Sequence, residues 1–214
     1  MTIREAIRRP TPLLAALAAI GTLALAACDT GTLESPVDAP EVQADHSIHA
    51  LASQRPAGPD AGGAPDLARM RAGSAPFRNV DRAVAAGFVD VSGCVSAPPG
   101  APFTGAMGHH YVNLERLADI GVDPSRPEML LYIPNAQGRM ELVGVEFAVN
   151  AEAWHELHGN DVFPEVAGVR FDPPVPGHPN PIVSTSYTLH VWNWRENPDG
   201  MFTPFNPTLS CPGA

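Results

Sequence analysis

Residues 142–149 read LVGVEFAV, and the alternation in this stretch decides the fold that the sequence predicts. Successive side chains of a β-strand point to opposite faces of its sheet. One face of this strand carries Glu146, flanked by Gly144 and Ala148. The other face is wholly apolar: Val143, Val145, Phe147 and Val149. The apolar face must pack against a core, so the carboxylate lies on the opposite side of the sheet.

Three further runs rich in β-branched and aromatic residues predict neighbouring strands. The alternating stretch belongs to a strand over residues 140–149, and the other runs span 109–113, 129–133 and 187–194. The loop PNAQG, which follows residue 133, has the length of a hairpin connection and ends in glycine. The strands on either side of this loop are therefore expected to pair antiparallel.

A helix is expected before the strands, because four apolar residues fall at helical spacings of three and four: Phe77, Val80, Val84 and Phe88. Gly87 is placed as the C-terminal stop of this helix. A shorter helix over residues 66–71 also fits the sequence, with Asp66 as its N-cap.

Residues 151–186 contain six prolines, which excludes interior strands and indicates an ordered surface loop. The expected fold is an α+β domain, with a small antiparallel sheet of about four to five strands, one short helix packed on it and long proline-rich loops. All 14 aromatic residues lie at or after Phe77. We assign the folded domain to residues 66–214.

The composition excludes several classes of protein. With 24 prolines and 19 glycines among 214 residues, the chain is not a helical bundle or a coiled coil. It has 13 arginines and no lysine, which excludes the P-loop, Schiff bases and lysine general bases. A net charge of −10 argues against nucleic acid as a partner and leaves metal cations or small neutral molecules as ligands.

The N-terminus predicts export. Residues 1–27 combine arginines, an uncharged apolar run and small residues, which is typical of a signal peptide. The sequence LAAC that ends at Cys28 resembles the lipobox of bacterial lipoproteins, in which the cysteine is acylated. The alternative is ordinary signal-peptide cleavage after Ala24-Leu25-Ala26, which would leave a soluble secreted protein. Residues 28–65, rich in Ala, Pro and Gly, are then expected to form a disordered tether. The tether would join the domain to a membrane, with the domain facing the periplasm or the cell exterior.

If Cys28 is acylated, two cysteines remain, Cys94 and Cys211, in an oxidising compartment. A disulfide between them is the preferred expectation. Two free thiols bound to a metal are the alternative.

Strand alternation also selects three candidate metal ligands: His110, Glu146 and His190. They lie on three predicted strands, and they converge beside an opening at Gly144 if the faces of these strands coincide. Two imidazoles and a carboxylate form a ligand set that suits zinc, copper or non-haem iron. The alternatives are a structural network, in which Glu146 is the partner of two half-buried histidines, and a small-molecule pocket without metal. His109 points to the opposite face and is the weaker candidate.

Aromatic residues near the last strand are a second candidate site. Trp192, Trp194 and Tyr132 are candidates for a platform on which a planar ligand stacks. The alternative is that these side chains belong to the core. The sequence HELH at residues 155–158 is one residue short of the zincin motif HExxH, so we expect its two histidines to face solvent.

Five stretches of the chain form a recognisable set: GAMGHHYVN (105–113), PEMLLY (127–132), LVGVE (142–146), LHVWNWRENP (189–198) and NPTLSC (206–211). As a set they resemble a family of uncharacterised exported bacterial proteins and lipoproteins. Members usually carry one histidine where this chain has His109 and His110, and the second position is the shared one. The resemblance implies an exported single domain and assigns no activity.

Two functions follow as hypotheses. The first is a binding or structural module of the cell envelope, held at a membrane by its lipid. The second is a metal-binding protein or metalloenzyme with a two-histidine, one-glutamate site.

Overall fold

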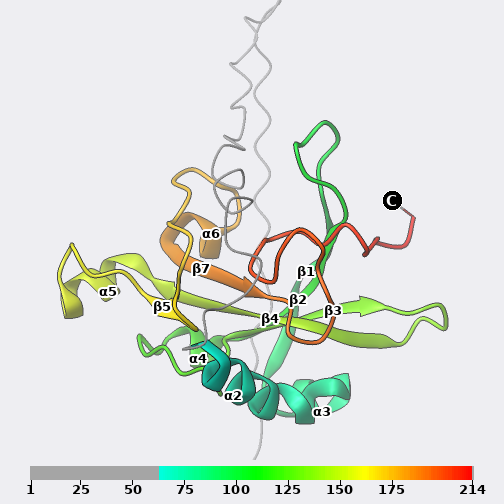
Figure 1. Ribbon diagram of the computed structural model, residues 1–214, viewed down its shortest axis with the longest axis horizontal. Coiled ribbons are helices and arrows are strands. Elements are labelled where there is room, and N and C mark those ends of the chain that lie inside the picture. Colours follow the sequence, from blue (N-terminus) through cyan, green and yellow to red (C-terminus); the bar gives the residue numbers. More distant parts are fainter. Residues whose placement is uncertain (1–62, 214) are drawn as a thin grey trace, which may run out of the picture. The chain divides into compact units, whose positions relative to one another are not determined.

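The computed structural model describes residues 63–213 and contains a five-stranded antiparallel sheet with strand order β1-β2-β3-β4-β7 (Figure 1). The strands are β1 (Phe88–Ser96), β2 (Ala106–Asn113), β3 (Met129–Pro134), β4 (Met140–Asn150) and β7 (Ser186–Val191). β3 and β4 pair antiparallel, as the hairpin-length loop between them predicts. The predicted α+β fold with a small antiparallel sheet is confirmed.

Short helices and a second, two-stranded sheet surround the main sheet. The helical segments are α2 (Ala64–Ser74), the 3-10 helix η2 (Ala75–Arg78), α3 (Val80–Ala85), α4 (Leu114–Leu117), α5 (Ala151–His158) and α6 (Pro181–Thr185). β5 (Glu165–Val166) and β6 (Val169–Arg170) form the second sheet. Within residues 63–213, no helix has the length and apolar character needed to cross a bilayer.

The predicted signal peptide, Cys28 and most of the predicted tether lie outside the described residues. α2 begins at Ala64, so the end of the predicted tether is helical. The prediction that Asp66 caps this helix is wrong, because Gly63 is the N-cap residue and Asp66 lies in the first turn. The Asp66 carboxylate instead accepts hydrogen bonds from the Arg69 side chain and from the backbone N–H of Ala167 at 2.9 Å.

The predicted helix that starts near Phe77 and stops at Gly87 is wrong in its extent, although Gly87 does follow the end of α3. Its apolar residues are divided among η2, α3 and β1, and Phe88 is the first residue of a strand that the sequence did not predict. The rings of Phe77 and Phe88 still contact each other, with centroids 5.2 Å apart. Phe77 and Phe88 therefore share a core contact from a 3-10 helix and a strand, whereas Val84 is exposed.

The segment over residues 151–186 is more structured than the expected surface loop. It contains α5, the small β5–β6 sheet and α6. The Asn150 side chain caps α5 by accepting from the backbone N–H of Ala153, and Asn180 caps α6 in the same way at Ile182. Pro181 occupies the start of α6, a helix position that does not need an N–H donor.

The two faces of the main sheet bury different clusters. We call the face that packs against α2, η2 and α3 the helix face, and the opposite one the loop face. Large, fully buried side chains fill the helix face: Phe88, Leu130, Tyr132, Phe147 and Leu189. The loop face carries two smaller groups, a Trp192 cluster (Ala106, Leu131, Ile133, Val143, Trp192, Leu209 and Cys211) and a Met129 cluster (Val112, Met129 and Ala148).

A bulge in β4 separates Val143 from the other residues of its predicted apolar face. Leu131 pairs with Gly144 and Tyr132 pairs with Leu142, so Val143 is the extra residue between two successive pairs. Val143 consequently packs in the Trp192 cluster on the loop face, and Leu142 joins the helix face. From Gly144 onward the predicted alternation holds, which puts Glu146 on the loop face.

The predicted disulfide between Cys94 and Cys211 is present, with Cα atoms 5.7 Å apart. It ties β1 to the C-terminal segment across 117 residues of sequence. The same segment also pairs with β2 through the backbones of Ala106 and Asn206. The C-terminal segment is therefore fixed over the loop face at two points.

Replacing both cysteines by alanine should lower the free energy of unfolding by about 5 kcal/mol, the chain-entropy value for a loop of this length. Urea denaturation of the oxidised protein and of the double variant measures the difference. The unaltered protein in excess reductant is the control, and it should unfold at the variant's midpoint. Equal midpoints for the oxidised protein and the variant would show that the crosslink does not stabilise the fold.

Candidate metal centre

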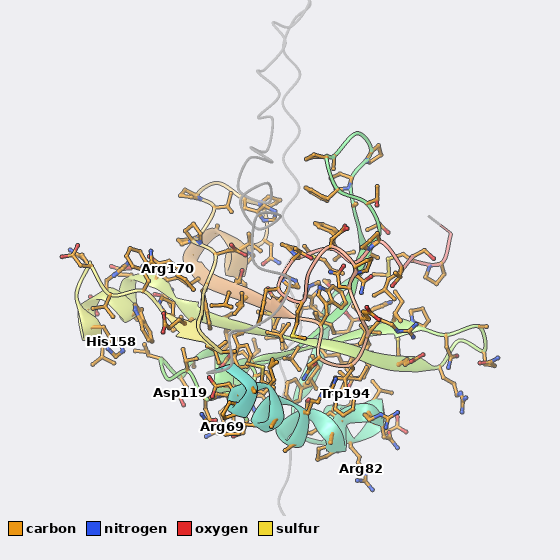
Figure 2. The ribbon with its side chains drawn as sticks, in the orientation of Figure 1. Arg69, Arg82, Asp119, His158, Arg170 and Trp194 are labelled. Carbon is orange, nitrogen blue, oxygen red and sulfur yellow. A yellow bond between two sulfur atoms is a disulfide. The ribbon has the colours of Figure 1, made fainter. Side chains whose placement is uncertain are left out.

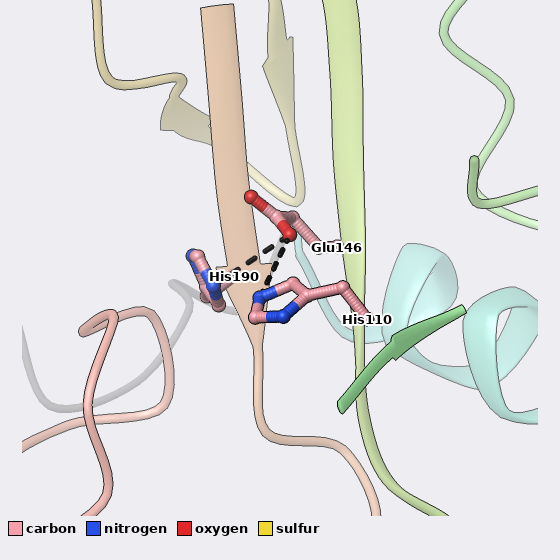
Figure 3. Close-up of side chains that lie close together, drawn as sticks. All are labelled: His110, Glu146 and His190. Atoms are coloured by element: carbon pink, nitrogen blue, oxygen red, sulfur yellow. Dashed lines mark ion pairs between the residues drawn. The ribbon is translucent and has the colours of Figure 1, made fainter. Parts of the chain in front are cut away.

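The three predicted metal ligands meet on the loop face of the sheet (Figure 3). His110 lies on β2, Glu146 on β4 and His190 on β7. Glu146 and His190 are directly opposite each other in the β4–β7 pair. His110 is two strands away from Glu146, and the intervening strand β3 presents Leu131 and Met129 opposite these positions. The side chains of His110 and Glu146 together span this distance, since their ends are 3.5 Å apart.

A single carboxylate oxygen lies within reach of both imidazoles. Glu146 Oε2 is 3.5 Å from His110 Nε2 and 3.7 Å from His190 Nε2. The two rings are nearly perpendicular, with an interplanar angle of 88° and centroids 5.8 Å apart. One ligand atom from each of the three residues lies within 4.8 Å of the others. The three side chains thus surround a common point.

The site is almost closed to solvent. The exposed fractions of the side chains are 12% for His110, 5% for Glu146 and 7% for His190. The Trp192 cluster and the Met129 cluster flank it on the same face of the sheet. Charges in such surroundings interact strongly, because little water is present to screen them.

Burial shifts the pKa values of His110 and Glu146 in the directions that leave both groups neutral. It lowers the pKa of His110 to about 4. It also raises the pKa of Glu146 to about 8, and the nearby negative charges of Asp172 and Glu128 add to this rise. Without a bound cation, the site at neutral pH therefore holds an uncharged imidazole and a protonated carboxyl.

The predicted opening at Gly144 is absent, because a Cβ atom there would lie 2.8 Å from the carbonyl oxygen of Val191. The same atom would be 3.3 Å from Leu131 Cδ1 and 3.4 Å from the Trp192 ring. Gly144 instead allows strand β4 to pack closely against its neighbours beside the site.

The other predicted histidines have separate partners. His109 is outside the cluster, and its Nδ1 contacts Asp90 Oδ2 at 2.7 Å. In α5, His158 is exposed as predicted, but His155 is not a solvent-facing residue. His155 Nε2 lies 2.9 Å from the hydroxyl of Tyr187, which joins α5 to the start of β7.

The predicted aromatic platform is wrong, because Tyr132 and Trp192 are buried on opposite faces of the sheet and Trp194 is half-buried on the helix face. Tyr132 has an exposed fraction of 0% and lies in the core of the helix face. Trp192 has an exposed fraction of 2% on the loop face, where its Nε1 donates to the carbonyl of Thr203. β7 ends at Val191, and Trp194 turns to the helix side, where its Nε1 donates to the Oγ of Ser74, the last residue of α2 (Figure 2).

Two polar residues near the site were missed by the sequence reasoning. Ser92, in β1, has its Oγ 3.1 Å from His110 Nδ1. Glu128 is buried, and its carboxylate accepts a hydrogen bond from the backbone N–H of Ala148 at 3.1 Å. β3 begins only at Met129, so the Glu128 side chain takes the place of a strand partner there. A carboxylate immediately before an apolar strand was the available signal for Glu128.

Comparisons with protein-family models, curated proteins and solved structures find no match to this chain, so its function has to be argued from the geometry of the site.

Glu128 gives the metal-free protein a testable dependence on pH. Burial raises the pKa of Glu128 to about 8 from an ordinary value of 4.5. Between these values the folded chain keeps a proton that the unfolded chain releases, so stability falls as the pH rises towards 8. Glu128→Gln removes this titration and keeps an oxygen that accepts from Ala148. As the pH rises, the free energy of unfolding of the variant should fall less steeply than that of the unaltered protein. The two slopes should differ by roughly 1 kcal/mol per pH unit.

Urea denaturation of the metal-free protein from pH 5 to pH 8 makes this measurement. Glu156→Gln, at an exposed position of α5, is the matched control and should keep the slope of the unaltered protein. Equal slopes for Glu128→Gln and the unaltered protein would contradict the raised pKa.

Proposed function

We propose that this chain is an exported binding domain of the cell envelope whose ligand is one divalent transition-metal ion. His110, Glu146 and His190 are its ligands. The observation that carries the proposal is the position of Glu146 Oε2, within 3.5 and 3.7 Å of two imidazole nitrogens from two other strands. No reaction is assigned to the site.

The distances between the ligand atoms suit a metal ion better than a set of hydrogen bonds. An N–H···O hydrogen bond brings its nitrogen and oxygen to about 2.7–3.2 Å, and both distances at Glu146 are longer. Ligands about 2.1 Å from a tetrahedral zinc are roughly 3.4 Å from each other, close to what is found here. The three ligand atoms lie within 4.8 Å of one another, so a small movement of the imidazoles completes the site.

The charges near the site also favour a cation. The negative charge of Asp172 is close enough to Glu146 to raise the pKa of Glu146. Both histidine ligands bind metals in the neutral form, which burial favours for His110. A divalent ion would displace the proton of Glu146 and offset the negative charges of Glu146 and Asp172.

The ligand types narrow the choice of metal. Two imidazoles and one carboxylate suit zinc, copper and non-haem iron, and they disfavour calcium and magnesium, which prefer oxygen ligands. Zinc accepts these ligands without a redox change and tolerates a fourth, exchangeable position. Zinc is therefore the first metal to test, followed by copper.

The envelope location rests on the sequence. A signal peptide over residues 1–27 and acylation of Cys28 would place the domain outside the cytoplasm, held at a membrane by its lipid. The Cys94–Cys211 disulfide agrees with an oxidising compartment. The family resemblance also implies an exported domain.

The metal proposal is tested by purifying the exported protein, incubating it with zinc or copper, removing unbound metal and counting the metal by elemental analysis. We expect one ion per chain. His190→Ala should lower the zinc affinity by at least about a hundredfold, because two protein ligands remain in place of three. Isothermal titration calorimetry measures the affinity of each variant.

His109→Ala is the matched control, since His109 adjoins a proposed ligand in sequence and is paired with Asp90 outside the cluster. It should bind zinc as the unaltered protein does. Failure of the unaltered protein to retain zinc or copper would exclude the metal proposal and favour a structural network of Glu146 and the two histidines.

Attachment to the membrane is tested separately by labelling expressing cells with radioactive palmitate. The unaltered protein should incorporate label and sediment with membranes, because its acyl chains insert into the bilayer. Cys28→Ser should abolish both the incorporation of label and the sedimentation with membranes. A mature protein that begins after ordinary cleavage and carries no label would contradict the lipid anchor and leave the metal proposal intact.

A further inference from the structure

We propose that Ser92 is a positioning residue that holds His110 in the tautomer with its proton on Nδ1, so that the lone pair of Nε2 faces the metal site. The consequence for metal binding rests on the function proposed above. The tautomer itself is a property of the metal-free protein and is tested independently.

The hydrogen bonds at the Ser92 hydroxyl decide the tautomer. A serine hydroxyl has one hydrogen to donate and two lone pairs that accept. Ser92 Oγ donates to the carbonyl oxygen of Gly93 at 2.7 Å and accepts from the backbone N–H of His110 at 3.0 Å. The remaining contact, with His110 Nδ1 at 3.1 Å, leaves only an acceptor position on the hydroxyl. Nδ1 must therefore be the donor.

A neutral imidazole carries a proton on one nitrogen only. With the proton on Nδ1, the other nitrogen, Nε2, has a lone pair and lies 3.5 Å from Glu146 Oε2. Metal-binding histidines generally donate their second ring N–H to a neighbouring acceptor in this way, which fixes the ring and the tautomer. Ser92 supplies that acceptor here.

The local structure of β1 explains why the hydroxyl lies at this position. The pairing of β1 with β2 is irregular between Asp90 and Cys94. The carboxylate of Asp90 accepts from the backbone N–H groups of Ser92 and Gly93, at 3.3 and 3.1 Å. Gly93 has a φ of 61°, a left-handed conformation that glycine adopts without strain. This turn fixes the backbone that carries Ser92.

Ser92, His110 and Glu146 are of the same residue types as the serine, histidine and carboxylate of a hydrolytic triad. A triad would need the Ser92 hydroxyl to donate to Nδ1 and an Nε2–H to donate to Glu146. The Ser92 hydroxyl instead donates to the carbonyl oxygen of Gly93. The 3.5 Å between His110 Nε2 and Glu146 Oε2 is longer than an N–H···O hydrogen bond. The geometry therefore favours a metal-ligand histidine oriented by Ser92.

Long-range proton–nitrogen NMR spectra of the metal-free protein at neutral pH test the inference, because they report which ring nitrogen carries the proton. We expect His110 to be protonated on Nδ1 in the unaltered protein and in Ser92→Thr, which keeps the hydroxyl. In Ser92→Ala this preference should be lost, and zinc affinity should fall by about tenfold to a hundredfold. Ser92→Thr should retain the zinc affinity.

Ser96→Ala is the matched control, because it removes a hydroxyl from the same strand at the position paired with Ala106, away from both histidines. It should change neither readout. A proton on Nε2 of His110 in the unaltered protein would overturn the inference, as would a Ser92→Ala variant that keeps the Nδ1 proton. If the unaltered protein binds no zinc, the proposed function fails, and the spectra of the metal-free protein still decide the role of Ser92.

Discussion

The structure of the candidate site depends on one carboxylate oxygen, Glu146 Oε2, held in apolar surroundings between two imidazoles. A buried carboxylate is costly unless a proton, a hydrogen-bond donor or a cation accompanies it. The two Nε2 atoms approach it at 3.5 and 3.7 Å, which leaves room for an ion between the groups. Every other feature of the site serves to bring these three side chains to one point.

Two irregularities of the sheet adjoin this site. The bulge at Val143 changes the face of the preceding part of β4 and lets Trp192 and Val143 pack together beside the site. The irregular pairing of β1 brings Ser92 against His110 from the neighbouring strand. The Cys94–Cys211 disulfide lies next to this second irregularity and ties it to the C-terminal segment. The polar site is thus supported by its neighbours in the sheet and by the crosslink.

Side-chain alternation was sufficient to find the three candidate ligands, because β2, β4 and β7 keep a regular pattern at His110, Glu146 and His190. The hairpin-length loop after residue 133 predicted the β3–β4 pairing, and the predicted helix and strands together predicted the α+β class. Alternation failed where the backbone departs from regular pairing. Val143 is apolar and suits either face, so its bulge has no signature in the sequence. Trp194 follows the end of β7 and turns to the helix side, which alternation cannot predict.

Ser92 was missed for a related reason. The spacing of Phe77 and Phe88 suggested one helix, so the strand that begins at Phe88 and carries Ser92 was not expected. Its hydroxyl reaches His110 only through a pairing 18 residues apart in sequence. Glu128 was missed because its role depends on where β3 begins. Residues that orient a site from a neighbouring strand can be identified only when the pairing register of the two strands is known.

The most direct test of the central claim is X-ray absorption spectroscopy of the zinc-loaded protein. The account predicts two imidazole nitrogens at about 2.0–2.1 Å and one carboxylate oxygen at about 2.0–2.2 Å from the zinc. His109→Ala should leave this spectrum unchanged, and His190→Ala should remove one imidazole contribution. A sulfur shell, or a zinc spectrum that is the same with and without His190, would contradict the account.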